Sequence, residues 1–261
     1  IDRVGEIALQ THRVAWEGVE FVGDLTIALG RALLGRARFR GSDLALLVEQ
    51  NGFEALPIVT LVTFLLGLIL AFVGAVQLQT FGATIYVADL VGVAMVRDMG
   101  ALITGIVMAG RSGAAFAAQL GSMKVTQETD ALTTMAISPM EFLVVPRVLA
   151  LCLMMPLLTL YGDAMGVLGG GFVGLTMLDL SAMEYLRQTS TAVSLTDVAG
   201  GVLKGTVYGI LIAISGCLRG MQSGKSSSAV GDAATSAVVT GIVSIIIACG
   251  MFAFVFYTLG I

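Results

Sequence analysis

Long apolar blocks separated by short polar stretches make up most of the chain. Five of these blocks are each about 20 residues or longer, which is enough for a helix to cross the hydrocarbon core of a bilayer. They predict transmembrane helices at residues 56–78, 89–111, 148–178, 198–218 and 233–259. The expected fold class is therefore all-α, a polytopic membrane protein with five transmembrane helices.

The first polar stretch, residues 14–34, has the spacing of an amphipathic helix, with charges on one side and apolar residues on the other. Its charged residues are Glu17, Glu20, Asp24 and Arg31. Four charges make it a poor span, so we expect a helix in the membrane interface, with Trp16 and the basic residues Arg36, Arg38 and Arg40 at headgroup level. A soluble helix packed on the cytoplasmic side is the alternative. We expect residues 1–54 to form these N-terminal helices and residues 55–261 to form the five-span domain.

A polar segment that cannot lie in lipid follows the second apolar block. The helical pattern continues from Ser112 to Gly121, and residues 124–138 are then largely polar. We expect the second helix to leave the membrane and a short polar helix to lie outside it. A polar helix that lies outside the membrane between two spans is an element that another protein can contact and displace.

Composition excludes a soluble domain. Hydrophobic residues make up 57% of the 261 residues and charged residues 12%, with a mean hydropathy of +0.95, whereas a soluble domain carries about 25% charged residues. With a cytoplasmic N-terminus, only Arg187 among the basic residues that flank the spans would face the other side. The cytoplasmic set would be Arg36, Arg38, Arg40, Arg111, Lys124, Arg147, Arg219 and Lys225. The positive-inside rule therefore predicts a cytoplasmic N-terminus and a C-terminus on the opposite side.

Residue types that carry catalysis are scarce. Cys152, Cys217 and Cys249 lie far apart in apolar segments, where a free cysteine packs as a small hydrophobe. His12 is the only histidine, and the sequence GRSGA around Ser112 lacks the GxSxG order of a nucleophile elbow. We therefore expect no catalytic residue, no metal and no cofactor on this chain.

Two glycine-rich stretches look like nucleotide-binding motifs but do not fit them in context. Gly169, Gly171 and Gly174 satisfy GxGxxG inside a predicted span with no preceding strand. Residues 166, 170 and 174, and again 201, 205 and 209, have the four-residue spacing of closely packed transmembrane helices, so we predict packing. Residues 224–226 read GKS, yet Arg219 stands where a P-loop requires its first glycine.

Charged residues inside the predicted spans are the sharper signal. A charge at the bilayer centre costs roughly 2.5–3.5 kcal/mol, so such residues usually face a partner or a wet cavity. Counted down from the polar residue at the outer end of each span, Asp98 lies about 13 Å deep and Lys204 about 10 Å deep. We expect these two residues at similar depth in the outer half of the bilayer, with Arg97 nearby. Asp163, about 24 Å deep by the same count, is expected much nearer the cytoplasmic side.

Three interpretations of these charges stay open. Asp98 and Lys204 can form a structural ion pair between two spans, or can join Arg97 in a polar patch that touches a lipid headgroup. The third is an ion or proton path in a secondary transporter, although no clear internal repeat of the kind usual in such proteins is present. The first span adds an apolar wall that suits either acyl chains or helix packing. Its residues are Phe64, Gly67, Leu68, Ala71, Phe72 and Ala75.

The centre of the chain carries long specific matches to a known family. They read FGATIYVADLVG at 81–92, RDMG at 97–100, AGRSGAAFAAQLGSMKVTQETDAL at 109–132 and SPMEFLVVPRVLAL at 138–151. Over about residues 30–261 the sequence resembles the MlaE/YrbE family of ABC-transporter permeases. This resemblance implies a five-span permease that works as a homodimer in the bacterial inner membrane. It also implies cytoplasmic ATPase subunits that hold ATP and magnesium, and an MCE-domain protein on the periplasmic side.

The resemblance further implies the cargo and the roles of particular positions. The cargo would be glycerophospholipid moved between the inner membrane and the periplasmic carrier, which helps to maintain outer-membrane lipid asymmetry. Residues 125–136 would form the coupling helix that inserts into the ATPase. The coupling positions would be Lys124, Glu128, Asp130, Leu132 and Met135. The charged lipid-facing positions would be Arg97, Asp98 and Lys204, to which we add Phe64, Leu68 and Phe72 of the apolar wall as expected lining of the lipid cavity.

At three positions the chain differs from the family pattern, which changes the side-chain geometry expected there. Family members usually carry glutamate at the position of Asp98, proline at Ala101 and glutamate at Gln119. Some also carry an upstream regulatory STAS domain. Because the chain starts at Ile1 rather than at a methionine, an upstream STAS domain, or a separate STAS-domain partner, is a further expectation.

Overall fold

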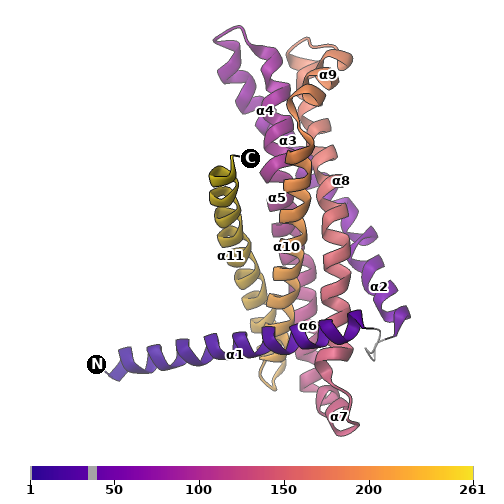
Figure 1. The fold of residues 1–261 in the computed structure, drawn as a ribbon, viewed down its shortest axis with the longest axis vertical. Helices are drawn as coiled ribbons and strands as arrows, with labels where there is room; N and C mark the ends of the chain where they lie inside the picture. The colour runs from indigo at the N-terminus through magenta and orange to yellow at the C-terminus, as the bar shows by residue number, and fades with distance from the viewer. Residues whose placement is uncertain (1, 35–39, 261) are drawn as a thin grey trace.

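The computed structural model describes residues 2–34 and 40–260. Figure 1 shows long helices running along one axis, with α1 (Asp2–Leu33) lying across their lower end. The elements after α1 are α2 (Gly41–Asn51), η1 (Phe53–Ala55), α3 (Leu56–Gln79), η2 (Thr84–Tyr86), α4 (Val87–Ala94), η3 (Met95–Met99), α5 (Gly100–Met108), η4 (Ala109–Gly113), α6 (Ala114–Val125), α7 (Glu128–Thr134), η5 (Met140–Val144), α8 (Val145–Met177), α9 (Ala182–Ala192), α10 (Leu195–Met221) and α11 (Ser227–Leu259). The turns η3, η4 and η5 are π-helical, so the helices on either side of η3 and of η4 continue through them.

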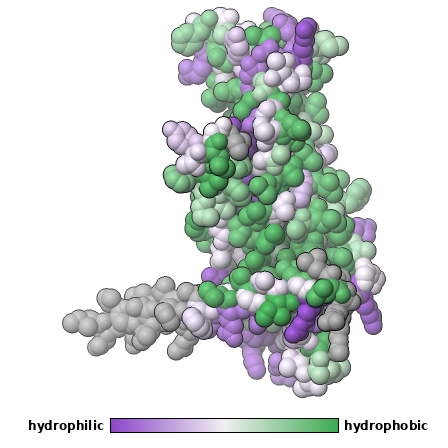
Figure 2. All heavy atoms as spheres, in the orientation of Figure 1, coloured by the Kyte–Doolittle hydropathy of each residue, from purple (hydrophilic) through white to green (hydrophobic). Residues whose placement is uncertain are grey.

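Five helical segments within the described residues are long and apolar enough to cross a membrane, which confirms the predicted fold class. They are Gly41–Gln79, Thr84–Val125, Met140–Met177, Leu195–Met221 and Ser227–Leu259. Figure 2 shows a broad hydrophobic surface between more polar upper and lower ends. The helices extend beyond the apolar blocks because caps rather than hydropathy set their ends. Ser194 caps α10 and Ser226 caps α11 through side-chain oxygens that accept backbone N–H groups.

Close helix packing accounts for the glycine-rich stretches, as predicted. A Cβ on Gly67 of α3 would overlap the backbone of Gly166 on α8, and a Cβ on Gly201 of α10 would overlap the Val96 carbonyl of η3. Only a residue without a side chain permits such an approach. As a result α8 packs against α3 and also against α10, while α10 packs against α5, α6 and α11.

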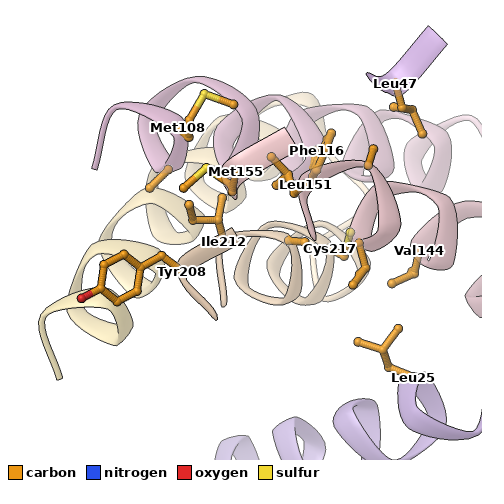
Figure 3. Close-up of a cluster of buried hydrophobic side chains, with 14 of the residues drawn as sticks. Leu25, Leu47, Met108, Phe116, Val144, Leu151, Met155, Tyr208, Ile212 and Cys217 are labelled. Carbon is orange, nitrogen blue, oxygen red and sulfur yellow. The ribbon is translucent and has the colours of Figure 1, made fainter. Parts of the chain in front are cut away.

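The larger apolar core lies where α5, α6, α8 and α10 meet. Figure 3 shows part of it, including Met108, Leu151, Met155, Ile212 and Cys217. Burying one such aliphatic side chain contributes about 1.5–3 kcal/mol. Cys217 is buried, Cys152 and Cys249 are half-buried, and all three thiols are free, in agreement with their prediction as packing residues.

The amphipathic helix α1 is attached to this core by its apolar side. Phe21, Leu25 and Ala28 are buried, and α1 packs against η5, α8 and α10. Arg31 from the predicted polar stripe pairs with Glu141 of η5 at 2.7 Å between Nη1 and Oε1. The charged side of α1 therefore contributes to docking as well as to solvation.

The remaining surface of α1 fits its expected place at the membrane interface. Trp16, Val19 and Ile27 are exposed, so the helix keeps apolar residues for headgroup and acyl contact. The helix begins at Asp2, upstream of the predicted residues 14–34. Of the basic residues placed at the headgroups, Arg40 is exposed just before α2, while residues 36 and 38 lie outside the described part of the chain.

The connection between the third and fourth spans contains a helix that the sequence analysis did not anticipate. This helix, α9, packs against α4 and α8. Its Tyr185 is buried and donates a hydrogen bond to the Val167 carbonyl at 3.1 Å, with Gly171 and Gly174 of α8 making room for the ring. Burial raises the pKa of Tyr185 to about 12. The glycine run of α8 therefore serves α9 on one side and α3 on another.

Candidate functional site

A π-helical turn places two adjacent charged residues inside the second span. The turn η3 carries Arg97 and Asp98 between α4 and α5 of the continuous helix Thr84–Val125. A π turn shifts the hydrogen-bond ladder by one residue, which frees carbonyl oxygens for other donors, and such turns are frequent at functional sites. The Arg97 carbonyl is used in this way, as an acceptor for a lysine of α10.

Lys204 joins α10 to this turn. Its Nζ donates to the Arg97 carbonyl at 2.8 Å and forms an ion pair with Asp98. The lysine side chain is 1% exposed and that of Asp98 37%. The Nζ also lies 4.8 Å from the centre of the Phe256 ring on α11, a cation–π contact. The predicted common level of Asp98 and Lys204 is confirmed.

Asp197 completes a cluster of four alternating charges that we term the outer cluster: Arg97, Asp98, Asp197 and Lys204. Arg97 Nη1 lies 3.4 Å from Asp197 Oδ1. Asp197 is also held by Ser194 in the capping box of α10. Sequence reasoning used Asp197 only to mark the end of a span. Its position seven residues, or two helical turns, before Lys204 on the same helix was the available signal.

The expected position of Asp163 was wrong. A Cβ on Gly100 would overlap the Asp163 carboxyl group, and one on Gly201 would lie 4.0 Å from its Oδ2. Asp163 is therefore level with the outer cluster, not far below it. The depth count failed because its reference residues do not lie at one level: the second span begins at Thr84, before Asp89, and α8 extends further above Asp163 than α10 extends above Gly201. The carboxyl group is buried, and neither oxygen has a hydrogen-bond partner among the residues that the structure describes.

The predicted apolar wall of α3 lies away from the outer cluster within one chain. The rings of Phe64 and Phe172 are 6.4 Å apart, and both line an apolar groove of about 510 Å³ between α3, α8 and α9. Leu68 is half-buried beside α8, and Phe72 is exposed. Helix α3 packs against α8, α4 and α5, whereas Lys204 lies on α10 beside α11. The structure therefore does not bring these aromatic residues to the charges.

The expected coupling segment, residues 125–136, contains α7, which lies at the lower end of the molecule in Figure 1. The helix covers only Glu128–Thr134, because Gln127 and Ala136 have left-handed backbone conformations, with φ of 61° and 56°, that break it on either side. The segment presents exposed and anchored side chains together. Glu128, Asp130 and Met135 are exposed, and Leu132 is half-buried against the core.

Lys124, the remaining predicted coupling residue, fastens the end of α6 to α10. Its Nζ donates to the Met221 carbonyl, the last residue of α10, at 2.8 Å. The outer cluster and this bond therefore tie α10 to both ends of the second span. A displacement of α7 can therefore be transmitted to the outer cluster along two helices, the second span and α10.

Comparison with known proteins agrees with this architecture. The family model described as Permease MlaE matches residues 46–255, which include the outer cluster and α7. The chain belongs to the MlaE permease family. Membership in this family makes it a transport component rather than an enzyme.

Individual relatives of this MlaE-family chain are similar over most of their length. A probable ABC transporter permease protein of Rickettsia typhi is 41% identical over 196 residues, 75% of this chain and 76% of the relative. The intermembrane phospholipid transport system permease protein MlaE of Haemophilus influenzae is 29% identical over 227 residues, 83% of this chain and 87% of the relative. The chloroplastic protein TRIGALACTOSYLDIACYLGLYCEROL 1 of Arabidopsis thaliana is 30% identical over 218 residues, 84% of this chain and 62% of the relative.

Proposed function

We propose that this MlaE-family permease is the membrane subunit of an ABC transporter that moves glycerophospholipid between the inner membrane and a periplasmic MCE-type carrier. Separate ATPase subunits hydrolyse ATP, and the transport helps to maintain outer-membrane lipid asymmetry. Relatives named ABC transporter permease and intermembrane phospholipid transport permease support this assignment. The N-terminus is cytoplasmic and the C-terminus periplasmic, which follows from the positive-inside rule.

The observation that carries the proposal is one continuous helix, Thr84–Val125, with a different polar group near each end. Its outer part holds Arg97 and Asp98, and its inner end leads through a two-residue turn into α7. The rise from residue 98 to residue 125 is about 40 Å. An ATPase that moves α7 therefore acts on the outer cluster through a single stiff element.

The outer cluster has the charges that a phospholipid headgroup requires. Arg97 and Asp98 are each more than a third exposed, at 36% and 37% of the side chain, while Lys204 is buried behind them. A phosphate can approach Arg97, and an ammonium group can approach Asp98, because both ionic partners are already fixed in place. The cluster sums to zero charge, so it suits a zwitterionic or a singly anionic headgroup.

A second copy of the chain is part of the proposal. The outer faces of α3 and α11 are apolar and exposed over most of their length, including Leu61, Leu65, Val243 and Met251. A homodimer would place this exposed face of α3 from each chain in a shared cavity with spans two and five, where acyl chains fit. The groove at Phe64 adds apolar surface on the outer side of α3.

Association with the ATPase tests the coupling role of α7. The permease is co-expressed with the ATPase subunit of the same organism, and the amount of ATPase that co-purifies is measured. Reversal of both charges, Glu128→Lys with Asp130→Lys, should abolish co-purification, whereas Asp179→Lys with Glu184→Lys at the other end of the molecule should leave it intact. Normal co-purification of the first variant would contradict the coupling role.

Lipid movement by the reconstituted complex tests the transport itself and separates it from an ion-coupled transporter. Transfer of labelled phospholipid should require ATP and should not respond to an imposed sodium or proton gradient. The exchange of the charged pair, Asp98→Lys with Lys204→Asp, restores a structural ion pair but not a headgroup site. Full transport by this double variant would show that the role of the pair is structural. Gradient-driven transport without ATP would instead support the ion path.

A further inference from the structure

A polar cavity of about 300 Å³ lies at the second π turn, far along the helix from the outer cluster. It is enclosed by the end of α2, the turn η1 and the start of α6. Its lining includes Asn51, Glu54, Arg111, Ser112 and Gln119. The proposed transport cycle assigns no task to these residues.

Ser112 forms part of this lining and lacks a partner. Its side chain is 2% exposed, and its hydroxyl group makes no hydrogen bond within the described residues. A buried hydroxyl without a partner costs stability. Ser112 lines the cavity, so rotation of its side chain would bring the hydroxyl to an acceptor oxygen of a ligand bound there.

Arg111 brings positive charge and spare donors to the same cavity. Its Nη1 donates to the Gln50 carbonyl at 2.7 Å, and its Nη2 donates to Glu54 Oε2 at 3.1 Å. A guanidinium group has five N–H donors, so three remain. The bonds to the Gln50 carbonyl and to the exposed Glu54 fix the side chain, and the remaining donors are available to an anion.

A second arginine makes the surroundings of the cavity net positive. Arg147 is buried directly behind the lining, with its Nη2 donating to Gln119 Oε1 at 3.2 Å and its guanidinium group 5.7 Å from the centre of the Phe116 ring. Within the described residues, the Nε of Arg147 has no hydrogen-bond partner. Of the two arginines, Arg111 lines the cavity and Arg147 lies behind it, while Glu54 is 57% exposed at the rim. A phosphate fits the inner part of the cavity, and an ammonium group fits the rim.

Apolar residues beside the cavity indicate a lipid rather than a soluble ligand. Phe53, next to Glu54 in the chain, is exposed, and so are Ile58, Leu61 and Leu65 along the adjoining face of α3. These side chains continue from the polar rim onto the apolar surface of the first span. A headgroup in the cavity would leave its acyl chains against this face of α3.

We propose that the cavity binds the phosphodiester headgroup of a zwitterionic phospholipid in the cytoplasmic leaflet, and that it is a second lipid site distinct from the outer cluster. The phosphate lies at Arg111 and Ser112, and the ammonium group lies at Glu54. The assignment rests on the proposed lipid-transport function and names the headgroup class. It also places a lipid at the π turn through which motion from α7 must pass.

Equilibrium binding of phosphatidylethanolamine to the purified permease–ATPase complex tests the site. Native mass spectrometry counts the lipids bound, and deuterium uptake in residues 50–54 and 109–116 locates them. Phosphatidylglycerol lacks the ammonium group, and inorganic phosphate represents a soluble source of the same anion. We expect phosphatidylethanolamine to bind more tightly than phosphatidylglycerol and to protect both segments, and we expect inorganic phosphate to protect neither.

Two conservative substitutions test the contacts of the phosphate and of the ammonium group separately. Ser112→Ala should weaken binding of both lipids about tenfold, because a hydrogen bond to a charged phosphate is lost. Its Tm without lipid should equal or exceed that of the wild type, because an unpartnered hydroxyl is removed. Glu54→Gln should reduce phosphatidylethanolamine binding to the level of phosphatidylglycerol. Ser122→Ala on α6 and Glu49→Gln on α2 are matched controls outside the cavity.

Unchanged binding in both Ser112→Ala and Glu54→Gln would overturn the proposal. Protection of the two segments by inorganic phosphate alone would overturn the lipid assignment in favour of a soluble anion. Since the measurement requires no ATP hydrolysis, it is independent of the transport assay. A complex that binds lipid here but moves none with ATP would refute the proposed function and leave the site standing.

Discussion

The two π turns of the second span carry the same kind of local distortion but have opposite surroundings. At η3, Asp98 meets a lysine that is 1% exposed, and Arg97 meets Asp197, so every charge has a partner on another part of the bundle or beside it. At η4, within the described residues, Arg111 has its ion pair with the exposed Glu54, and the neighbouring Ser112 hydroxyl has no partner. Both turns pack against α10, but η4 also opens into a cavity on another side.

The comparison shows that a π turn exposes polar groups, whereas the surrounding helices determine what those groups bind. The turn brings adjacent polar residues and free carbonyls out of the regular helical ladder. What happens next depends on the neighbouring helix. Gly201 lets α10 approach η3 closely and Gly216 lets it approach η4, whereas a Cβ on Gly110, on another face of η4, would meet nothing within 4 Å. Mutations at the two turns should therefore have unequal effects.

The largest effect is expected for Gly201→Ala. The added Cβ would overlap the Val96 carbonyl oxygen, and backbone cannot move aside as the end of a flexible side chain can. Overpacking of this kind typically costs about 1–3 kcal/mol, and a backbone clash belongs at the upper end. Thermal unfolding of the purified permease in detergent should show a clear drop in Tm, and a wild-type Tm would mean that α10 does not pack tightly on η3.

Asp98→Ala should have the next largest effect. It leaves Lys204 buried with only the Arg97 carbonyl and the Phe256 ring as partners. Removing one member of a buried pair costs about 3–5 kcal/mol, and the partial exposure of Asp98 lowers our expectation to about 2 kcal/mol. Lys204→Met should be milder, because the carboxylate it leaves behind is only partly buried. If the order of the two Tm values were reversed, the outer cluster would not be buried on the lysine side.

A smaller effect is expected where the ion pair is exposed. Glu54→Gln removes the partner of Arg111 at the rim of the inner cavity, and such surface pairs contribute about 0–1 kcal/mol. The change in unfolding free energy should stay within that range and shrink further in high salt. Glu49→Gln on the same helix is the control. A loss as large as that of Asp98→Ala would show that the two turns are equally closed.

Gly110→Ala should have the smallest effect, with a gain in stability of about 0.5 kcal/mol. The substitution adds a methyl group in open space and restricts the unfolded chain. Tm is again the measurement, and Gly201→Ala is the matched comparison on the packed side. A strong loss of stability would indicate that a second chain or a lipid closely covers η4 in the detergent-purified protein.

Much of the molecule follows from local sequence. The five spans and the glycine packing faces were predictable because apolar length and four-residue spacing act within a single helix. The pairing of Asp98 with Lys204 was predictable because each is a costly charge at a countable depth. Asp163 was misplaced because Asp89, Asp179 and Asp197 do not lie at one level, and α9 was missed because it depends on packing against α4 and α8. Asp197 was overlooked because its partner, Arg97, lies a hundred residues away.

The sequence by itself determined the class of protein, the number of spans, the charged residues that must find partners and the family. These properties depend on composition, periodicity and motif, which are read along the chain. Only the tertiary structure decided that Asp197 completes the outer cluster and that Phe64 and the charges lie on separate surfaces of the chain. It also showed that Ser112 lies in a cavity without a partner. Such features depend on which helices meet and at what height, and packing between distant segments sets both.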